Sequence, residues 1–121
     1  MIFMATTSTR TVTIVYSGDT VGTQSLAAAS NTTSPGAVTI QTLASGFNTI
    51  TVPSTTGVVV KSVTIVPPAS NTQTIVLKGV TGDTGVGLHL TDPTTIALAS
   101  TVTTIGLTAG AEITNVKFFW T

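Results

Sequence analysis

Threonine alternates with valine and isoleucine along much of this chain, and that pattern restricts its fold more than any other feature. The 121 residues include 29 threonines. Threonine, valine and isoleucine are branched at Cβ, so they suit a pleated strand and lose side-chain freedom in a helix. Residues 37–43 are typical, because Val38 and Ile40 alternate there with Thr39 and Gln41. The sequence therefore predicts an all-β protein with a polar, uncharged surface.

The spacing of these segments indicates the architecture. Eight or nine short segments of this kind follow one another, about ten residues apart with turn residues between them. This pattern is typical of an antiparallel β-sandwich or a small barrel. A sandwich is favoured, because both faces of the segments are populated and their lengths vary. A jelly-roll order fits the number of strands.

The chain is short enough to be one domain preceded by an arm. Residues 11–121 are predicted to form a single β-sandwich domain, which is long enough to bury a core. Residues 1–10 have little to bury and are expected to form a flexible N-terminal arm, which either stays disordered or becomes ordered on a partner.

Three segments give sharper expectations. Residues 37–52 are predicted to form a hairpin, because a small-residue turn separates two alternating runs. Residues 58–66 form the most apolar run and are predicted to be a central strand with Val63 and Ile65 facing the core. The polar residues 30–36 end in Pro-Gly and are predicted to be a loop.

Charge and cysteine content exclude several classes of protein. Four basic and four acidic side chains give a net charge of zero, and they are scattered, so nucleic-acid binding is not expected. The absence of cysteine excludes disulfides and leaves the redox state of the compartment open. No apolar run is long enough for a membrane span. Low net charge promotes association, so we expect part of the surface to be covered by copies of the chain or by another partner.

His89 is the only histidine and therefore the first candidate for proton transfer near neutral pH. Alternation places it opposite Leu88 and Leu90, which indicates a surface or interface position. One histidine cannot build a multi-histidine metal site within a single chain. A site shared by three subunits on a symmetry axis is left open.

The tripeptide Gly-Asp-Thr occurs twice, around Asp19 and Asp83. Its functional interpretation is a calcium or sugar site in a loop, but calcium takes six or more oxygen ligands and no second acid lies nearby. The alternative is a turn in which the carboxylate accepts local backbone N–H groups, and this is the interpretation we favour. Asp92 precedes Pro93 and is predicted to begin a turn. The sequence contains no nucleophile, phosphate-loop or dinucleotide motif, so neither catalysis nor a cofactor or metal is expected.

Aromatic residues gather at the end of the chain. Successive strand residues face opposite sides, so Phe118 and Trp120 share one face, while Phe119 shares the other with Ile113. Either this strand is buried on both sides, or one of its aromatic faces is an exposed anchor for a neighbouring subunit. With Phe3 near the N-terminus, the candidate interface residues are Phe3, Phe118, Phe119 and Trp120.

Three segments carry a resemblance to a known class of proteins: residues 48–53 (NTITVP), 63–68 (VTIVPP) and 77–86 (LKGVTGDTGV). In these segments the chain resembles small β-sandwich virion proteins of tailed bacteriophages. The resemblance extends over about residues 37–120 and rests on composition and rhythm, with Lys-Gly-x-x-Gly-Asp-x-Gly as its most specific part. No functional residue is carried over from it.

The resemblance implies a building block present in many copies in the virion, commonly a trimer when it decorates a capsid. The expected function is that of a capsid decoration (cement) protein that stabilises the phage head. The expected partners are other copies of the chain and the major capsid protein or other virion proteins. A carbohydrate-binding or adhesin module at a tail or fibre is the alternative, and a neck or tail ring component is another.

Overall fold

The computed structural model describes residues 4–15, 23–25, 27–79 and 82–121. These residues form strands, turns and loops, and none of them belongs to a helix that could cross a membrane. In chain order the strands are β1 (Thr6–Arg10), β2 (Thr13–Val15), β3 (Thr23–Ser25), β4 (Ala29–Ser34), β5 (Ala37–Leu43), β6 (Gly46–Thr51), β7 (Ser62–Val66), β8 (Ile75–Lys78), β9 (Val86–Gly87), β10 (Thr94–Ala97), β11 (Thr104–Ala109) and β12 (Ile113–Trp120).

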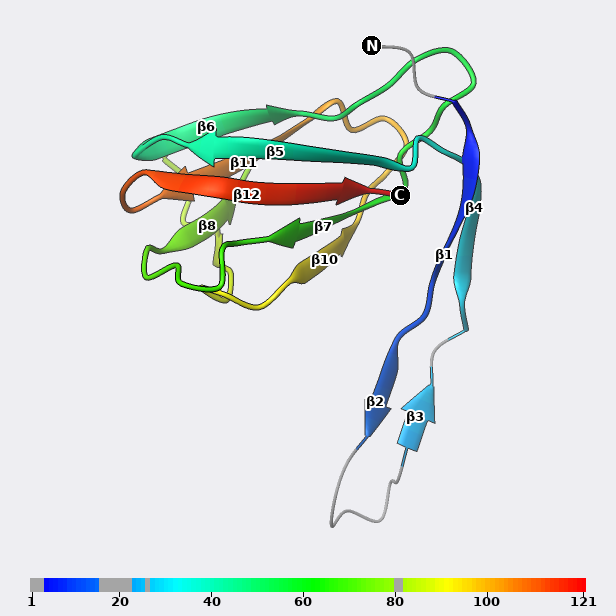
Figure 1. Ribbon diagram of the computed structural model, residues 1–121, viewed down its shortest axis with the longest axis horizontal. Helices are drawn as coiled ribbons and strands as arrows, with labels where there is room; N and C mark the ends of the chain where they lie inside the picture. Colours follow the sequence, from blue (N-terminus) through cyan, green and yellow to red (C-terminus); the bar gives the residue numbers. More distant parts are fainter. Residues whose placement is uncertain (1–3, 16–22, 26, 80–81) are drawn as a thin grey trace.

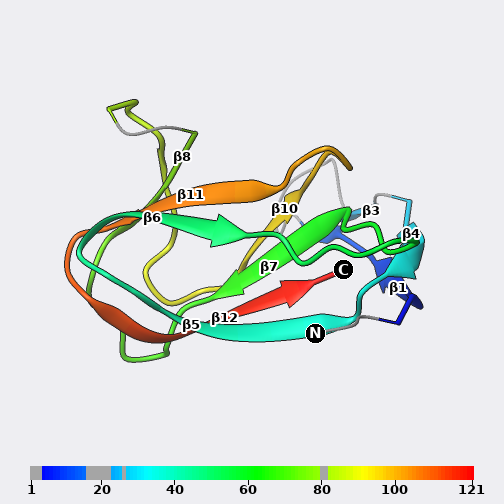
Figure 2. The same ribbon diagram turned by 90° about the horizontal axis from the view of Figure 1, so that it is seen from above.

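Strands β5 to β12 form two four-stranded antiparallel sheets that pack face to face (Figure 2). Sheet I has the strand order β10-β7-β12-β5, and sheet II has the order β6-β11-β8-β9. The chain therefore pairs β5 with β12, β6 with β11, β7 with β10 and β8 with β9. This nested pairing is the arrangement of an eight-stranded jelly roll. The predicted all-β antiparallel sandwich is confirmed, with the jelly-roll order.

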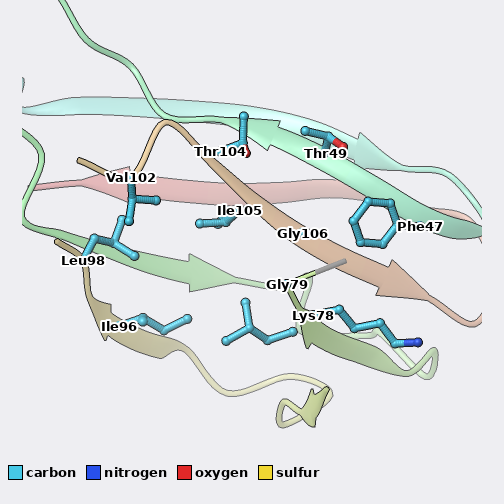
Figure 3. Close-up of a pocket in the computed structure, with 11 residues that line it drawn as sticks. Phe47, Thr49, Lys78, Gly79, Ile96, Leu98, Val102, Thr104, Ile105 and Gly106 are labelled. Carbon is cyan, nitrogen blue, oxygen red and sulfur yellow. The ribbon is translucent and has the colours of Figure 1, made fainter. Parts of the chain in front are cut away.

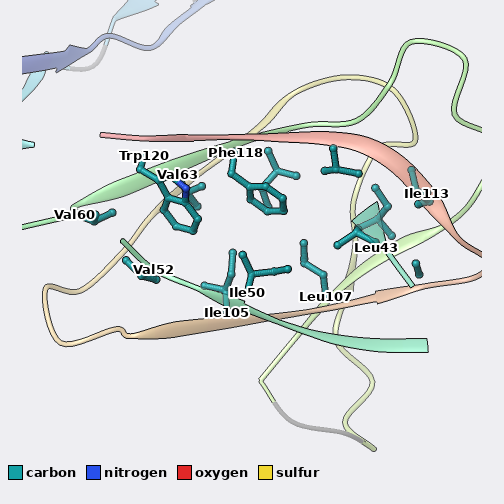
Figure 4. Close-up of a cluster of buried hydrophobic side chains, with 14 residues drawn as sticks. Leu43, Ile50, Val52, Val60, Val63, Ile105, Leu107, Ile113, Phe118 and Trp120 are labelled. Atoms are coloured by element: carbon teal, nitrogen blue, oxygen red, sulfur yellow. The ribbon is translucent and has the colours of Figure 1, made fainter. Parts of the chain in front are cut away.

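The core lies between the two sheets and contains fourteen buried hydrophobic side chains (Figure 4). Phe118 and Trp120 are its largest members, and their rings stack with centroids 5.8 Å apart. The Trp120 indole N–H donates to Thr39 Oγ1 at 2.9 Å, so the one polar atom of the ring has a partner inside the core. Strand β7 lies between β10 and β12, and Val63 and Ile65 are fully buried there, as predicted, although the strand begins at Ser62 and not at the predicted residue 58.

The first four strands lie outside the sandwich and form two successive two-stranded sheets, β1-β4 and β2-β3. We call this ribbon the arm. Strand β1 pairs with β4 and β2 pairs with β3, both antiparallel. Figure 1 shows the arm extending from one end of the sandwich, with β2 and β3 farthest from it. Residues 6–10, within the segment expected to be flexible, are therefore strand paired with β4. Residues 1–3 lie outside the described residues.

The predictions for residues 37–52 and 30–36 are wrong. Residues 37–52 do not form a hairpin, because β5 belongs to sheet I and β6 to sheet II. The Asn48 side chain bonds both the N–H and the carbonyl of Ala44 and so fixes a turn that carries the chain across the sandwich. Residues 30–36 are not a loop, because β4 extends from Ala29 to Ser34 before the chain turns at Gly36 with φ of 57°.

A β-bulge in β12 changes which residues share a face. Asn115 has φ of 59°, a left-handed conformation that asparagine tolerates better than most residues. The pairing of β12 with β5 shifts register between Ile113 and Val116, and both of these side chains are buried. Ile113 therefore shares the core face with Phe118, and its predicted place beside Phe119 is wrong.

Candidate functional site

The polar residues that sequence analysis singled out lie in local turns. His89 is exposed, and its Nδ1 accepts the backbone N–H of Asp92 at 2.9 Å and that of Thr91 at 3.3 Å. The Asp92 carboxylate lies 3.6 Å from the same nitrogen. A ring nitrogen that caps a turn in this way is already used as an acceptor, so His89 serves the turn before Pro93.

Asp83 also bonds within its own loop. Its Oδ2 accepts the backbone N–H of Gly79 at 2.8 Å, as the turn interpretation predicts. Asp19, in the other copy of the tripeptide, lies outside the described residues. In the part of the chain that the structure describes, no three His, Asp or Glu side chains gather in a way that could hold a metal ion.

The aromatic candidates separate into buried and exposed residues. Phe118 and Trp120 have no exposed surface, so they hold the two sheets together and cannot contact a neighbouring subunit. Phe119 points to the outer face of sheet I and is 38% exposed. Phe3 lies outside the described residues. Of the four candidate interface residues, Phe119 is therefore the one that the described structure presents to solvent.

An apolar patch surrounds Phe119 on the outer face of sheet I. Val38 lies opposite Phe119 on the neighbouring strand β5, and Ile40 lies opposite Lys117. Val38 is 52% exposed and Ile40 is 60% exposed, although valine and isoleucine normally face a core. We call these three exposed residues, Val38, Ile40 and Phe119, the sheet I patch. Lys117 is the only charged side chain beside them on β5 and β12.

A groove of about 660 Å³ opens on the side of sheet II (Figure 3). Strand β11 pairs with β8 only from Gly106 onward, so Ile105 has a strand on one side and the groove on the other. Ile96 and Leu98 come from the side of β10, and the Phe47 ring closes the groove where it lies across Gly106. The walls are mostly apolar, so the groove suits an apolar group better than a sugar or an ion.

The arm is fixed to the sandwich at its root. The backbone N–H of Val59 donates to the Thr33 carbonyl at 2.9 Å, and the Asn31 side-chain amide donates to the Val59 carbonyl at 2.8 Å. Asn31 and Ser34 are buried there. Farther out, Val12 is 40% exposed and Ile14 is 44% exposed. The arm therefore has a firm root and an outer part that presents apolar side chains to solvent.

The sequence predicted an arm over residues 1–10, but the arm extends to the end of β4 at Ser34, and the exposure of Val38 and Ile40 and the groove were not predicted. The second half of the arm was missed because residues 30–36 form a polar run with Pro-Gly at its end, which is typical of a loop. The patch was visible as the Val-Thr-Ile alternation of β5, but alternation does not say which face is buried. The groove arises where strands of both sheets end, and no local sequence pattern reports that.

No family model, no curated protein and no solved structure matches this chain. The support for a function therefore comes from the fold and the surfaces described above.

Proposed function

We propose that the protein is a virion structural protein, and specifically a decoration (cement) protein that stabilises the head of a tailed bacteriophage. The observation that carries the proposal is the arm, which extends from a jelly-roll sandwich and exposes Val12 and Ile14 (Figure 1). Jelly rolls are common in viral capsid and lectin domains, although a fold alone does not define a function. A ribbon that buries little of its own surface gains stability when it lies on a partner.

The proposed mechanism is physical and requires no catalysis. The arm lies on a neighbouring shell subunit, with Val12 and Ile14 as apolar contacts, and the sandwich stays outside as the decoration. A ligand that binds the assembled shell better than its separate subunits stabilises the shell by mass action. The proposed partners are the major capsid protein or other virion proteins and further copies of the chain, in a trimer or another homo-oligomer.

A carbohydrate-binding module at a phage tail or fibre is the rival function. Sugars stack on exposed aromatic rings, and Phe47 is 38% exposed beside the groove. The groove, however, offers few polar groups to a sugar, and Lys78 is the only charged side chain among the described residues that line it. A neck or tail ring component is a variant of the structural proposal that differs only in its position in the virion.

The proposal is tested with heads of the encoding phage assembled without this protein. Purified protein is mixed with the heads, and binding is measured by co-sedimentation, while the heat resistance of the heads is followed by DNA release. We expect saturable binding and a higher temperature of release. Replacing Val12 and Ile14 together by Asp should weaken binding at least about tenfold, because apolar contacts are lost and charge is buried.

The matched control is Val86→Asp, since Val86 is an apolar residue that is 63% exposed on the sandwich itself. This variant should bind heads as the wild type does. Absence of binding to heads would refute the decoration role, and binding to tails or necks would move the protein to the ring variant. A specific hit on a glycan array, lost in Phe47→Ala, would favour the carbohydrate-binding alternative.

A further inference from the structure

We infer that strand β5 is a pairing edge through which two copies of this chain form a dimer with a continuous sheet. Strand β5 is at the edge of sheet I, and within the described residues only β12 pairs with it. It has seven residues, whereas the opposite edge strand β10 has four and the edge strand β9 of sheet II has two. A long edge strand leaves a row of backbone N–H and C=O groups ready to pair with another chain.

Strand β5 lacks the features that normally protect an edge. Proteins discourage edge pairing with charged residues, proline, bulges or very short strands. The sequence of β5, AVTIQTL, has no charged residue and no proline. The bulge in this part of sheet I belongs to β12, between Ile113 and Val116, and it leaves the regular pairing from Gln41 to Ala37 intact.

The direction of the β5 side chains is a second, independent observation. Thr39 faces the core and accepts the Trp120 indole N–H, while Val38 and Ile40 face solvent. This is the reverse of the usual arrangement, in which apolar side chains face inward and threonine faces outward. The other long edge strand, β6, presents Thr49 and Thr51 beside Phe47 on its exposed face. The apolar face of β5 is therefore explained if a partner covers it.

The strand is self-complementary in one antiparallel register. If two copies pair about a two-fold axis at Thr39, Val38 of each copy lies opposite Ile40 of the other. Each patch residue of β5 then has an apolar neighbour across the new ladder, which is the kind of cross-strand pair that stabilises sheets. The apolar row on the outer face then runs from Phe119 through Val38 to Ile40 of the second copy. The result is an eight-stranded sheet made of two copies of sheet I.

Charge does not oppose this pairing. Lys117 lies on β12, one strand away from β5, so three strand spacings separate it from its counterpart in the dimer, or about 14 Å. That separation exceeds the Debye length of about 8 Å at physiological ionic strength, so the repulsion is largely screened. A two-fold contact uses the same edge on both copies, so no further copy can add to it. It therefore predicts a dimer, whereas the phage resemblance implies a trimer.

The test combines mass with hydrogen exchange on the full chain. Light scattering after size exclusion should give the mass of two chains, each of 12.2 kDa, with dissociation on dilution. In the monomer, every second amide of β5 points away from β12 and exchanges quickly with solvent. We expect these amides to become protected as the protein concentration rises, because edge pairing gives them partners.

Ile40→Lys is the disrupting variant, because it places a charge on the edge without touching the core. It should raise the dimer dissociation constant at least about tenfold. Thr51→Lys is the matched control, since it adds the same charge to the exposed face of the edge strand β6, and its dissociation constant should stay within about twofold of the wild type.

Three results would overturn the inference. One is a monomer at all concentrations, and another is a trimer that Ile40→Lys leaves unchanged. The third is protection of the outward β5 amides that does not depend on concentration, which would mean that the chain's own N-terminal residues cover the edge. None of these results bears on the binding of the arm to phage heads, so the dimer and the decoration role succeed or fail separately.

Discussion

Every buried Val, Leu, Ile, Phe and Trp side chain among the described residues lies in the sandwich, between Leu43 and Trp120. Among the arm residues that the structure describes, in contrast, the buried side chains are Asn31 and Ser34, and both are polar. The two regions are built from similar residues, with threonine prominent in each. They differ in whether valine and isoleucine have a second layer to pack against.

This difference gives the two regions different stabilities. Full burial of a large apolar side chain contributes about 1.5–3 kcal/mol. The core of the sandwich contains fourteen clustered apolar residues, all of them larger than alanine except Ala109. An isolated two-stranded ribbon is marginal in water, so the arm depends on its root and on whatever it binds. Proteins often use regions of low local stability to bind partners, and the amides of such regions exchange their hydrogens fastest.

The largest expected effect comes from the core of the sandwich. Phe118→Ala removes a fully buried ring that stacks on Trp120, and the cavity that it leaves should lower the free energy of unfolding by about 3–5 kcal/mol. Phe119→Ala is the control on the next residue of the same strand, where the side chain is exposed and the loss should be about 0.5 kcal/mol. Urea denaturation measures both. Equal losses would mean that sheet I is not oriented as described.

Much of the sandwich could be predicted from period-two alternation. The bounds of β5 agree with the predicted segment 37–43, and the inward direction of Val63 and Ile65 is confirmed. These features depend on local pattern, since a strand with one buried face must repeat every two residues. The jelly-roll order fitted the number of strands, but the sequence did not select it.

What the sequence did not predict depends on contacts between distant residues. The crossing from β5 to β6 depends on the pairing of β5 with β12 and of β6 with β11, and a pattern of alternation cannot say whether two strands share a sheet. Strand β4 is held by the bond from Asn31 to Val59, which is 28 residues away in sequence. The direction of Val38 follows from the bond between Trp120 and Thr39, 81 residues apart.

The second prediction concerns the buried polar contact that orients β5. Thr39→Val keeps the shape of the side chain but removes the acceptor of the Trp120 indole N–H. A buried donor without a partner costs about 1–3 kcal/mol, and thermal or urea unfolding should show this loss. Thr64→Val is the control, because the Thr64 hydroxyl bonds Thr95 at an exposed position, and about 0.5 kcal/mol or less is expected there. If Thr39→Val leaves the free energy of unfolding unchanged, then the indole N–H has another acceptor.

The third prediction tests whether the arm depends on its root. Asn31→Ala removes the bond to the Val59 carbonyl and the acceptor of the Thr33 N–H. We expect a local loss of about 1–2 kcal/mol, seen as faster hydrogen exchange in β1 and β4. Core amides such as that of Leu107 should be unaffected. Thr32→Ala, at an exposed neighbouring position, is the control and should leave exchange in the arm unchanged. If Asn31→Ala speeds exchange in the core as well as in the arm, then arm and sandwich unfold as one unit.

The smallest effect is expected where the arm is most exposed. Replacing Ile14 by Thr in the free chain should change the free energy of unfolding by about 0.5 kcal/mol or less, because the side chain is 44% exposed and the substitution keeps the β-branched shape. Ile65→Thr makes the same change at a fully buried position, where placing a hydroxyl in the core should cost about 2 kcal/mol or more. Urea denaturation of the two variants compares the same substitution in both regions. If Ile14→Thr proves as costly as Ile65→Thr, then the arm packs on its own chain in solution. Its apolar residues would then not be free for a partner, and the proposed attachment to the phage head would lose its main support.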